Sequence, residues 1–341
     1  MISPNSYWSG RFNDWPEPQP AEPGYTLLVP VPGDLPVFLE LALNVLARQD
    51  AAHRIETLVI PDKMTPAMAA ITAGYASTWN GPLRTLPLPL PERYVLPLMR
   101  NPGRNHGVQL IEGIGKARGS HVLMHDADLF LLDAGILDER YVEASTESLF
   151  ALGVSPVWDS WFVDHGYRLT ATWELMADRD WLRAFPPAMH IGHEAEALGE
   201  RHVFDTTLRA QLLSDQRRIR THEIDEQFVH FNYVISTYRH FQNAKATYCD
   251  NKFRLLLIRL FVDLFARYDA PYNLPSLDEL AQSLTRGDGA VSYPSATPSA
   301  IADYQAYRRN VERILTGPWA AEKGADLSER LAPFDARYVE G

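Results

Sequence analysis

In His121-Val122-Leu123-Met124-His125-Asp126-Ala127-Asp128, a short apolar run leads directly into two carboxylates. A run of this kind, opened by Gly119, is typical of a buried strand. On an extended segment, carboxylates at positions i and i+2 point to the same side, so both reach one hard cation, Mn²⁺ or Mg²⁺. The sequence therefore predicts a metal site formed by Asp126 and Asp128 at the carboxyl end of a strand.

Strands and helices alternate ahead of this stretch. Short apolar runs predict strands, and apolar residues three and four positions apart predict helices. The expected strands cover residues 25–31, 57–62 and 83–88, and the expected helices cover residues 35–49, 65–75 and 107–118. Prolines make the third strand short or place it at a sheet edge. Glu40 is expected off the apolar face of the first helix. The pattern predicts an α/β fold with a mainly parallel sheet between helices.

The rest of the chain divides into three further parts. Residues 1–24 are rich in proline and polar side chains, which predicts an irregular arm over the surface. Residues 134–250 alternate less regularly than residues 25–133. They hold a predicted strand at 148–157, an aromatic loop at 158–167, and helices near 170–185 and 206–214. Residues 251–341 predict a helical carboxyl-terminal extension, with helices at 253–268, 277–285 and 302–315.

Composition narrows the class of function. A chain of 341 residues with 46% hydrophobic residues can bury a large core. The formal net charge of -11 repels polyanions, which argues against nucleic acid as a partner. Because Cys249 is the single cysteine, an intramolecular disulfide and a multi-cysteine zinc site are both excluded. This cysteine content fits a reducing compartment, and the cytoplasm is the simplest location.

Membrane spanning is not expected. No basic and then apolar segment opens the chain, so we expect no cleaved secretion signal. The longest apolar run, residues 255–262, is interrupted by Arg259, followed by Asp263, and too short to cross a bilayer. It predicts a core helix first and a helix on a membrane surface second, so peripheral membrane contact stays open. Nothing in the sequence indicates an oligomeric state.

Five separate elements follow one another between residues 25 and 133. They are a helix ending near Gln49, a strand ending in Asp62, the helix start Asn105-His106-Gly107, the helix stop Ala117-Arg118-Gly119, and Asp126-Ala127-Asp128. In this order they resemble the family 2 type of GT-A glycosyltransferases. A DxD triplet alone occurs by chance in many chains, so the order of the elements carries the resemblance. It implies a Rossmann-like GT-A fold, a nucleotide-sugar donor and a bound Mn²⁺ or Mg²⁺. It also implies that residues 25–133 form the half that binds the donor and that residues 134–250 form the half that binds the acceptor.

The resemblance also implies roles for single residues on the donor side. Pro30 and Val31 would line the nucleotide pocket, and Asp62 would contact the nucleobase or ribose. Asp126 and Asp128 would hold the metal and the diphosphate. The family often has two acidic residues or a serine after its second strand, whereas Pro61-Asp62-Lys63 stands here. A turn residue that ends the strand is therefore the alternative for Asp62.

Arg104 and Asn105 lie just before the predicted helix at 107–118. The backbone N–H groups and positive dipole at a helix start attract anions, and Arg104 adds charge, so this segment is a candidate diphosphate site. An ordinary turn with a helix N-cap is the alternative.

A further metal ligand, often a histidine, comes from the carboxyl half of GT-A enzymes. His222, His230 and His240 lie in that half, and neutral imidazole suits Mn²⁺. His230 is the first choice because it follows a short apolar run, as a ligand at a strand end would. A histidine packed in the core is the alternative.

An inverting transfer needs a carboxylate base that takes the proton of the acceptor hydroxyl. Asp205 is the first candidate because it resembles the acidic residue that precedes the acceptor-side helix in the family. A helix N-cap is its alternative. Glu194 is the second candidate. Five aromatic residues are candidates for stacking on a sugar, although a core cluster is the more common arrangement: Trp158, Trp161, Phe162, Tyr167 and Trp173.

Three other classes of protein compete with this interpretation. Phosphohydrolases of the haloacid-dehalogenase type place their DxD after the first strand, whereas three strands precede it here. A sugar-phosphate nucleotidyltransferase would carry a glycine-rich basic loop after its first strand, and Pro30-Val31-Pro32-Gly33-Asp34 is not such a loop. A non-catalytic nucleotide-sugar-binding protein stays open. We expect a glycosyltransferase that uses a UDP- or GDP-sugar and a glycan, lipid-linked or small-molecule acceptor.

Overall fold

The computed structural model describes residues 11–99, 102–155, 160–223, 227–231, 233–244, 253–267, 272–286, 291, 293–321 and 323–339. The chain packs as two compact units. The first unit comprises Met1–Asp34, Leu46–Ala127 and Asp133–Gln227. The second unit comprises Leu35–Val45, Asp128–Leu132 and Phe228–Gly341. The division into four parts by donor and acceptor role stays a prediction.

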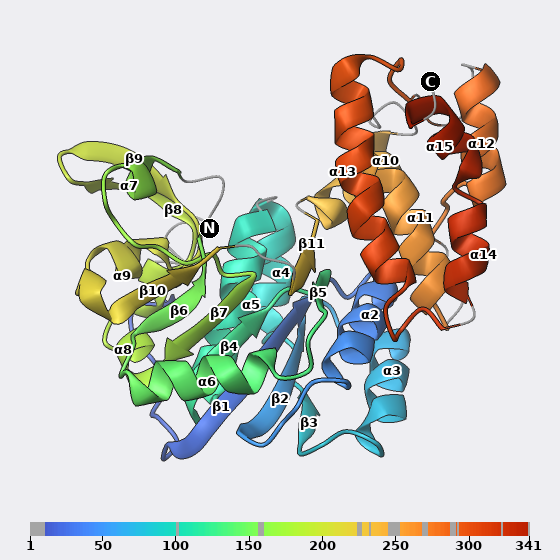
Figure 1. The fold of residues 1–341 in the computed structure, drawn as a ribbon. Coiled ribbons are helices and arrows are strands. Elements are labelled where there is room, and N and C mark those ends of the chain that lie inside the picture. The colour runs from blue at the N-terminus through green and yellow to red at the C-terminus, as the bar shows by residue number, and fades with distance from the viewer. Residues whose placement is uncertain are drawn as a thin grey trace. The chain divides into compact units, whose positions relative to one another are not determined.

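A seven-stranded sheet forms the centre of the first unit (Figure 1), in the order β10-β6-β7-β4-β1-β2-β3. Its strands are β1 (Glu22–Val31), β2 (Arg54–Pro61), β3 (Leu83–Thr85), β4 (Gly119–His125), β6 (Ala151–Val154), β7 (Glu174–Asp178) and β10 (Ile219–His222). β1 lies parallel to both β2 and β4, β2 is parallel to β3, and β6 is parallel to β10. Only β7 runs antiparallel to its neighbours β4 and β6. The predicted α/β class with a mainly parallel sheet is confirmed, and β3 is the short edge strand that its prolines indicate.

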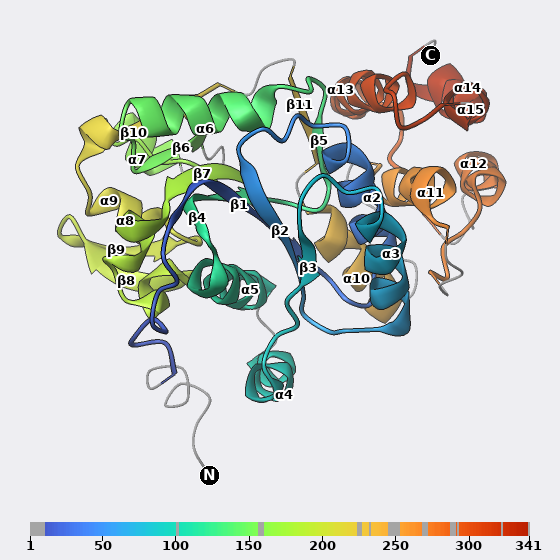
Figure 2. The same cartoon turned by 90° about the horizontal axis from the view of Figure 1, so that it is seen from below.

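Helices cover both faces of this sheet, with α5 on one face and α6 on the other (Figure 2). The helices of the first unit are α3 (Pro66–Ala76), α4 (Leu90–Met99), α5 (Pro102–Lys116), α6 (Ile136–Thr146), α7 (Ser160–Asp164), α8 (Arg179–Arg183) and α9 (Leu208–Leu212), with short 3₁₀ helices at Pro187–His190 and Gln216–Arg218. Val108 and Ile114 of α5 are fully buried. A Cβ atom on Gly113 would lie 2.6 Å from Cδ1 of Ile60, so glycine allows α5 to pack close against the sheet.

A smaller cluster of the first unit lies beside a hairpin. The hairpin joins β8 (His193–Ala197) to β9 (Glu200–Phe204). The buried residues of the cluster are Phe162, Leu169, Phe204, Leu208 and Leu212. The rings of Phe162 and Phe204 stack with 5.5 Å between their centroids.

Several predictions for the first unit are wrong. The segment 170–185, predicted as a helix, contains strand β7 and the short helix α8. β7 is buried along most of its length between two other strands, so it lacks the alternating pattern that would reveal a strand. No helix is predicted for residues 90–99, yet α4 begins at Leu90, because proline is tolerated in the first turn of a helix. The aromatic segment 158–167 contains the helix α7.

The amino-terminal arm packs on the first unit from Arg11 onward, and its residues 1–10 lie outside the described residues. Phe12 is 1% exposed, and its carbonyl accepts the Ala188 N–H at 2.9 Å. The Trp15 indole donates to the carbonyl of Phe185 at 2.7 Å. The arm therefore joins the hydrophobic core before β1 begins at Glu22.

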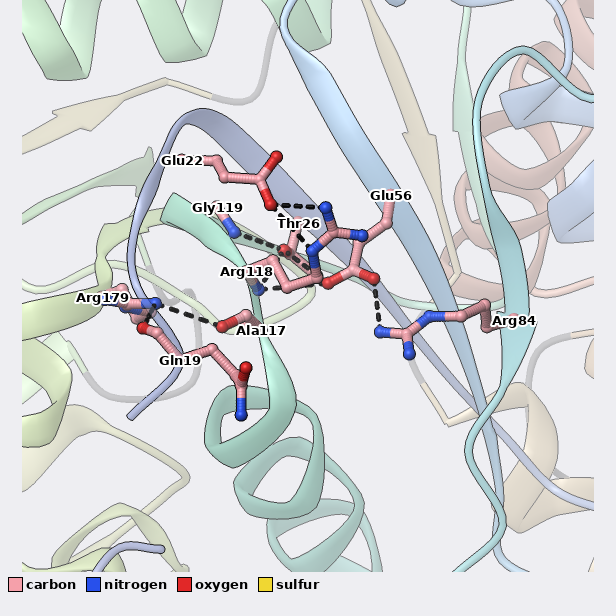
Figure 3. Close-up of polar contacts among 9 residues, drawn as sticks. All are labelled: Gln19, Glu22, Thr26, Glu56, Arg84, Ala117, Arg118, Gly119 and Arg179. Atoms are coloured by element: carbon pink, nitrogen blue, oxygen red, sulfur yellow. Dashed lines mark hydrogen bonds and ion pairs between the residues drawn. The ribbon is translucent and has the colours of Figure 1, made fainter. Parts of the chain in front are cut away.

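A polar network ties β1, β2 and β4 together at the amino edge of the sheet (Figure 3). The fully buried Glu56 carboxylate accepts hydrogen bonds from the Thr26 hydroxyl at 3.3 Å and the Arg118 N–H at 3.1 Å, and it pairs with Arg84. The Thr26 hydroxyl oxygen in turn accepts the Gly119 N–H at 2.9 Å. The network fixes the connection through which α5 enters β4.

The second unit combines helices with one small antiparallel sheet. It holds α2 (Pro36–Leu46), β5 (Leu129–Leu131), β11 (Phe228–His230), α10 (Val234–Ala244), α11 (Arg254–Phe265), α12 (Leu277–Arg286), α13 (Pro298–Leu315), α14 (Lys323–Glu329) and α15 (Ala332–Tyr338). The run 255–262 lies in α11, and its apolar side chains are buried, as the core interpretation predicts. Within the described part of the chain, none of the helices has the length and apolarity needed to cross a membrane.

Glu40 of α2 contradicts the expectation that it lies off the apolar face. Its side chain is buried, and Oε2 accepts the backbone N–H of Arg267 at 2.8 Å. Burial raises the pKa of the Glu40 carboxyl to about 6. The carboxylate is therefore a link between α2 and the end of α11 and not a surface group.

Candidate functional site

The two acidic residues of the opening stretch lie in a turn. β4 ends at His125, and the Asp126 N–H extends its ladder by donating to the Trp173 carbonyl at 3.0 Å. Ala127 and Asp128 form a turn that leads into β5. The carboxylates were expected to converge on an extended segment, but a turn brings them together instead.

His230 reaches Asp128 through strand pairing. β11 runs antiparallel to β5, with His230 opposite Leu129, the residue that follows Asp128. His230 Nε2 lies 3.5 Å from Asp128 Oδ1, and the two side chains are 10% and 7% exposed. One ligand atom from each of Asp126, Asp128 and His230 lies within 4.8 Å of the others. The structure thus brings together the three residues that the sequence selected as metal ligands.

The donor set of this group fits a divalent cation. Two carboxylates supply hard oxygen ligands, and an imidazole supplies nitrogen. Mg²⁺ is usually bound by oxygen and water alone, whereas Mn²⁺ also accepts imidazole nitrogen. A divalent ion of either kind matches the charge of the group.

Helix α5 brings polar side chains to the carboxyl edge of the sheet in the first unit. It begins at Pro102, earlier than predicted, so Arg104 and Asn105 lie in its first turn and not ahead of it. Asn105 Nδ2 donates to Asp62 Oδ2 at 2.7 Å. Gln109 Nε2 donates to the carbonyls of Val31, at 3.0 Å, and Ile60. The first turns of α5 are thereby fixed to the ends of β1 and β2.

Asp62 acts as a turn residue in the structure. Its Oδ1 accepts the Gly33 N–H at 2.7 Å, and its own N–H donates to the Val31 carbonyl at 3.1 Å. A Cβ atom on Gly33 would lie 1.7 Å from the Lys63 carbonyl oxygen, so this close approach needs glycine. A contact from Asp62 to a nucleobase or ribose stays a prediction.

Pro30 and Val31 are the last two residues of β1, opposite Ile60 and Pro61 of β2. Both side chains are buried. They stand at the carboxyl edge where parallel sheets bind ligands, and their place in a nucleotide pocket stays a prediction.

The two candidate bases lie on and next to the β8–β9 hairpin. Glu194 points outward, with 56% of its side chain exposed, and pairs with Arg201 at 2.5 Å. Asp205 directly follows β9, and its Oδ1 accepts the Thr206 N–H at 2.7 Å. The N-cap position of α9 belongs to Thr207, so Asp205 is not the helix cap that its sequence context offered as an alternative.

The other residues singled out by sequence are distributed elsewhere. Phe162 and Trp173 are buried, as the core interpretation expects, and Trp158 lies outside the described residues. His222 lies on β10, and its Nε2 is 3.2 Å from Glu143 Oε2 of α6. The side chain of His240 lies outside the described residues.

One residue near the acidic turn was not selected by sequence. His106 Nε2 lies 3.8 Å from Asp126 Oδ1, and the two side chains are 29% and 27% exposed. His106 belongs to the helix start Asn105-His106-Gly107, and this position is the sequence feature that could have identified it as a site residue.

Comparison with known proteins gives remote structural likenesses. No protein-family model and no curated protein sequence matches the chain. The chain is similar to residues 1–349 of TarS from S. aureus, with 16% identity over 92% of this chain and 87% of that chain and a TM-score of 0.41. It is also similar to the mannosyltransferase PcManGT from Pyrobaculum calidifontis in complex with GDP-Man and Mn²⁺, with 14% identity over 99% and 94% of the two chains and a TM-score of 0.43.

A third likeness covers a smaller share of the chain. Glucosyl-3-phosphoglycerate synthase from Mycobacterium tuberculosis, in complex with Mn²⁺ and UDP-glucose, shares 14% identity over 47% of this chain and 57% of its own, with a TM-score of 0.34. Of these three proteins, PcManGT is named as a mannosyltransferase. At these identities and TM-scores the likeness assigns no activity to this chain, and the residues described above carry the proposal that follows.

Proposed function

We propose that this protein is a metal-dependent glycosyltransferase that moves a sugar from a nucleotide-diphosphate donor to an acceptor hydroxyl. The observation that carries the proposal is the group Asp126, Asp128 and His230 at the carboxyl end of β4. Bound Mn²⁺ or Mg²⁺ would neutralise the negative charge that grows on the leaving diphosphate. This is the chemistry that two carboxylates and an imidazole at the edge of a parallel sheet support best.

The residues of the chain hold the ligands in place. Asp128 is 5% exposed, and its pairing with His230 limits the orientations of both side chains. In a site from which water is partly excluded, fixed charges act more strongly on a developing charge than they do in water. Asp128 and His230 therefore form the rigid part of the metal site.

The start of α5 is the proposed diphosphate site. Its first-turn N–H groups have no acceptor within the helix, and the positive end of its dipole favours an anion. Arg104 stands in this turn and adds a guanidinium. Asn105, fixed on Asp62, keeps the turn at the ends of β1 and β2.

Asp205 is the proposed base, and Glu194 is the second choice because it is exposed and paired with Arg201. A base must take the proton from the acceptor hydroxyl as the bond to the sugar forms. The proposed donors are UDP- and GDP-sugars, and the proposed acceptors are glycans, lipid-linked sugars and small molecules.

The experiment is a donor-cleavage assay on the full chain. UDP- and GDP-sugars are incubated with Mn²⁺, Mg²⁺ or EDTA, with and without candidate sugar acceptors, and the released nucleoside diphosphate is measured. We expect release that needs the metal and falls about a hundredfold or more in Asp126→Ala and Asp128→Ala. Asp180→Ala is the matched control, because that carboxylate is 80% exposed on α8.

Three results would count against the proposal. Tight donor binding without any release of nucleoside diphosphate would indicate a non-catalytic nucleotide-sugar-binding protein. Formation of a nucleotide sugar from a nucleoside triphosphate and a sugar phosphate would indicate the nucleotidyltransferase alternative. Equal release of nucleoside diphosphate by the wild type and by Asp128→Ala would show that this carboxylate does not take part in the reaction.

A further inference from the structure

Helix α5 contacts the carboxyl ends of three neighbouring strands through three of its side chains. Asn105 bonds to Asp62 after β2, and Gln109 bonds to the last carbonyls of β1 and β2. His106, between them in the sequence, faces Asp126 after β4 with 3.8 Å between Nε2 and Oδ1. The first turn of α5 is therefore fixed to the sheet and lies next to Asp126.

Helix α5 is held in place along its whole length. Gly113 allows close packing on the sheet, and Val108 and Ile114 are fully buried beneath the helix. Beyond its carboxyl end, the N–H groups of Arg118 and Gly119 donate to the Thr26 hydroxyl at 3.1 Å and 2.9 Å. A side chain on the first turn of such a helix keeps its place relative to β4.

We propose that His106 is a positioning residue for the metal site: its imidazole holds the Asp126 carboxylate in the orientation that binds the cation. The inference rests on the proposed metal-dependent transfer. Asp126 is more exposed than Asp128, at 27% against 7% of the side chain. In the proposed arrangement, Nε2–H donates a hydrogen bond to this carboxylate once the 3.8 Å separation closes.

The expected effect is on metal affinity. Carboxylates that ligate a metal are themselves held by hydrogen bonds, and removing such a partner costs about ten- to a hundredfold in metal affinity or activity. Asp128 keeps its own histidine partner, His230, and is not affected directly. Loss of His106 therefore weakens the metal site without removing a ligand.

The test measures the Mn²⁺ dissociation constant of the full chain by titration. We expect His106→Ala to raise this constant about tenfold or more. His106→Gln keeps an N–H donor at a similar reach and should restore most of the affinity. His53→Ala is the matched control, because His53 is exposed and directly precedes β2, at the amino edge of the sheet, and it should bind as the wild type does.

Two further readouts separate positioning from a general structural role. The thermal midpoint without metal should be the same for wild type and His106→Ala. In the donor-cleavage assay, the Mn²⁺ concentration at half-maximal rate should rise, while the rate at saturating Mn²⁺ returns towards that of the wild type.

Each contrary result has a distinct meaning. If His106→Ala binds Mn²⁺ as the wild type does, while Asp128→Ala has lost it, this inference falls and the proposed function stands. If His106→Gln binds as weakly as His106→Ala, a donor at this place does not hold Asp126, and the inference falls as well. If the wild type binds no Mn²⁺, both the inference and the proposed function fall.

Discussion

The two edges of the seven-stranded sheet use carboxylates in different ways. At the amino edge, the Glu56 side chain is 0% exposed and bonded to groups of β1, β3 and the α5–β4 connection. At the carboxyl edge, His106 and Asp126 face each other with about a quarter or more of each side chain exposed to solvent. Helix α5 takes part in both edges, so one helix joins a structural network to a candidate site.

The two edges therefore serve stability and ligand binding separately. A buried carboxylate must be satisfied by the protein itself, because an unpaired charge in the core costs several kcal/mol. A carboxylate at the edge where parallel strands end remains open to a cation or a ligand. Substitutions at the amino edge should therefore change stability, and substitutions at the carboxyl edge should change binding.

Glu56→Ala should have the largest effect on stability. It leaves the Arg118 N–H without its Glu56 acceptor and takes the ion-pair partner from Arg84, so the free energy of unfolding should fall by about 3 kcal/mol. Denaturant unfolding measures this loss. The Mn²⁺ affinity of the folded fraction should not change, and a large loss of affinity would break the distinction between the two edges.

Glu40→Gln should show the next largest effect, and it depends on pH. Burial raises the pKa of Glu40 from 4.5 to about 6, so the stability that its protonated form contributes is complete below pH 4.5 and lost as the pH rises through 6. Glutamine has no proton to lose and keeps an acceptor for the Arg267 N–H. Relative to wild type, the variant should gain about 2 kcal/mol between pH 4.5 and pH 7.5. Denaturant unfolding at both pH values checks this, and a difference that does not vary with pH would contradict it.

Asn105→Ala should have the smallest effect on stability and a clear effect on binding. It removes one hydrogen bond to Asp62, which is worth about 1.5 kcal/mol because the acceptor is charged and the pair is only partly buried. The Michaelis constant for the donor should rise severalfold as the first turn of α5 loosens. Steady-state kinetics with varied donor measures this change. A normal Michaelis constant for the donor in this variant would show that the first turn of α5 does not contribute to donor binding.

Much of the first unit could be predicted because its signals are local. The strands β1, β2 and β4 are short apolar runs, and Thr65 caps α3 through its own side chain, which accepts the Met68 N–H at 3.3 Å. β7 could not be predicted in this way. It is buried between β4 and β6, and a buried strand lacks the alternation that separates it from a helix.

The candidate site was predictable for the residues that neighbour each other in the sequence. Asp126 and Asp128 belong to one triplet, whereas His230 was one of three histidines and became the neighbour of Asp128 only through the pairing of β11 with β5. The burial of Glu40 depends in the same way on Arg267, a distant partner that no local pattern reveals. Contacts of this kind arise from tertiary packing.

Pulsed electron paramagnetic resonance of the Mn²⁺-loaded protein identifies the side chains that bind the ion. If Asp126, Asp128 and His230 bind one ion, the spectrum should show coupling to a directly bound imidazole nitrogen. That coupling should disappear in His230→Ala while Mn²⁺ still binds more weakly, and binding should be lost in Asp128→Ala. A spectrum without nitrogen coupling, or one that is unchanged in His230→Ala, would contradict the three-residue metal site.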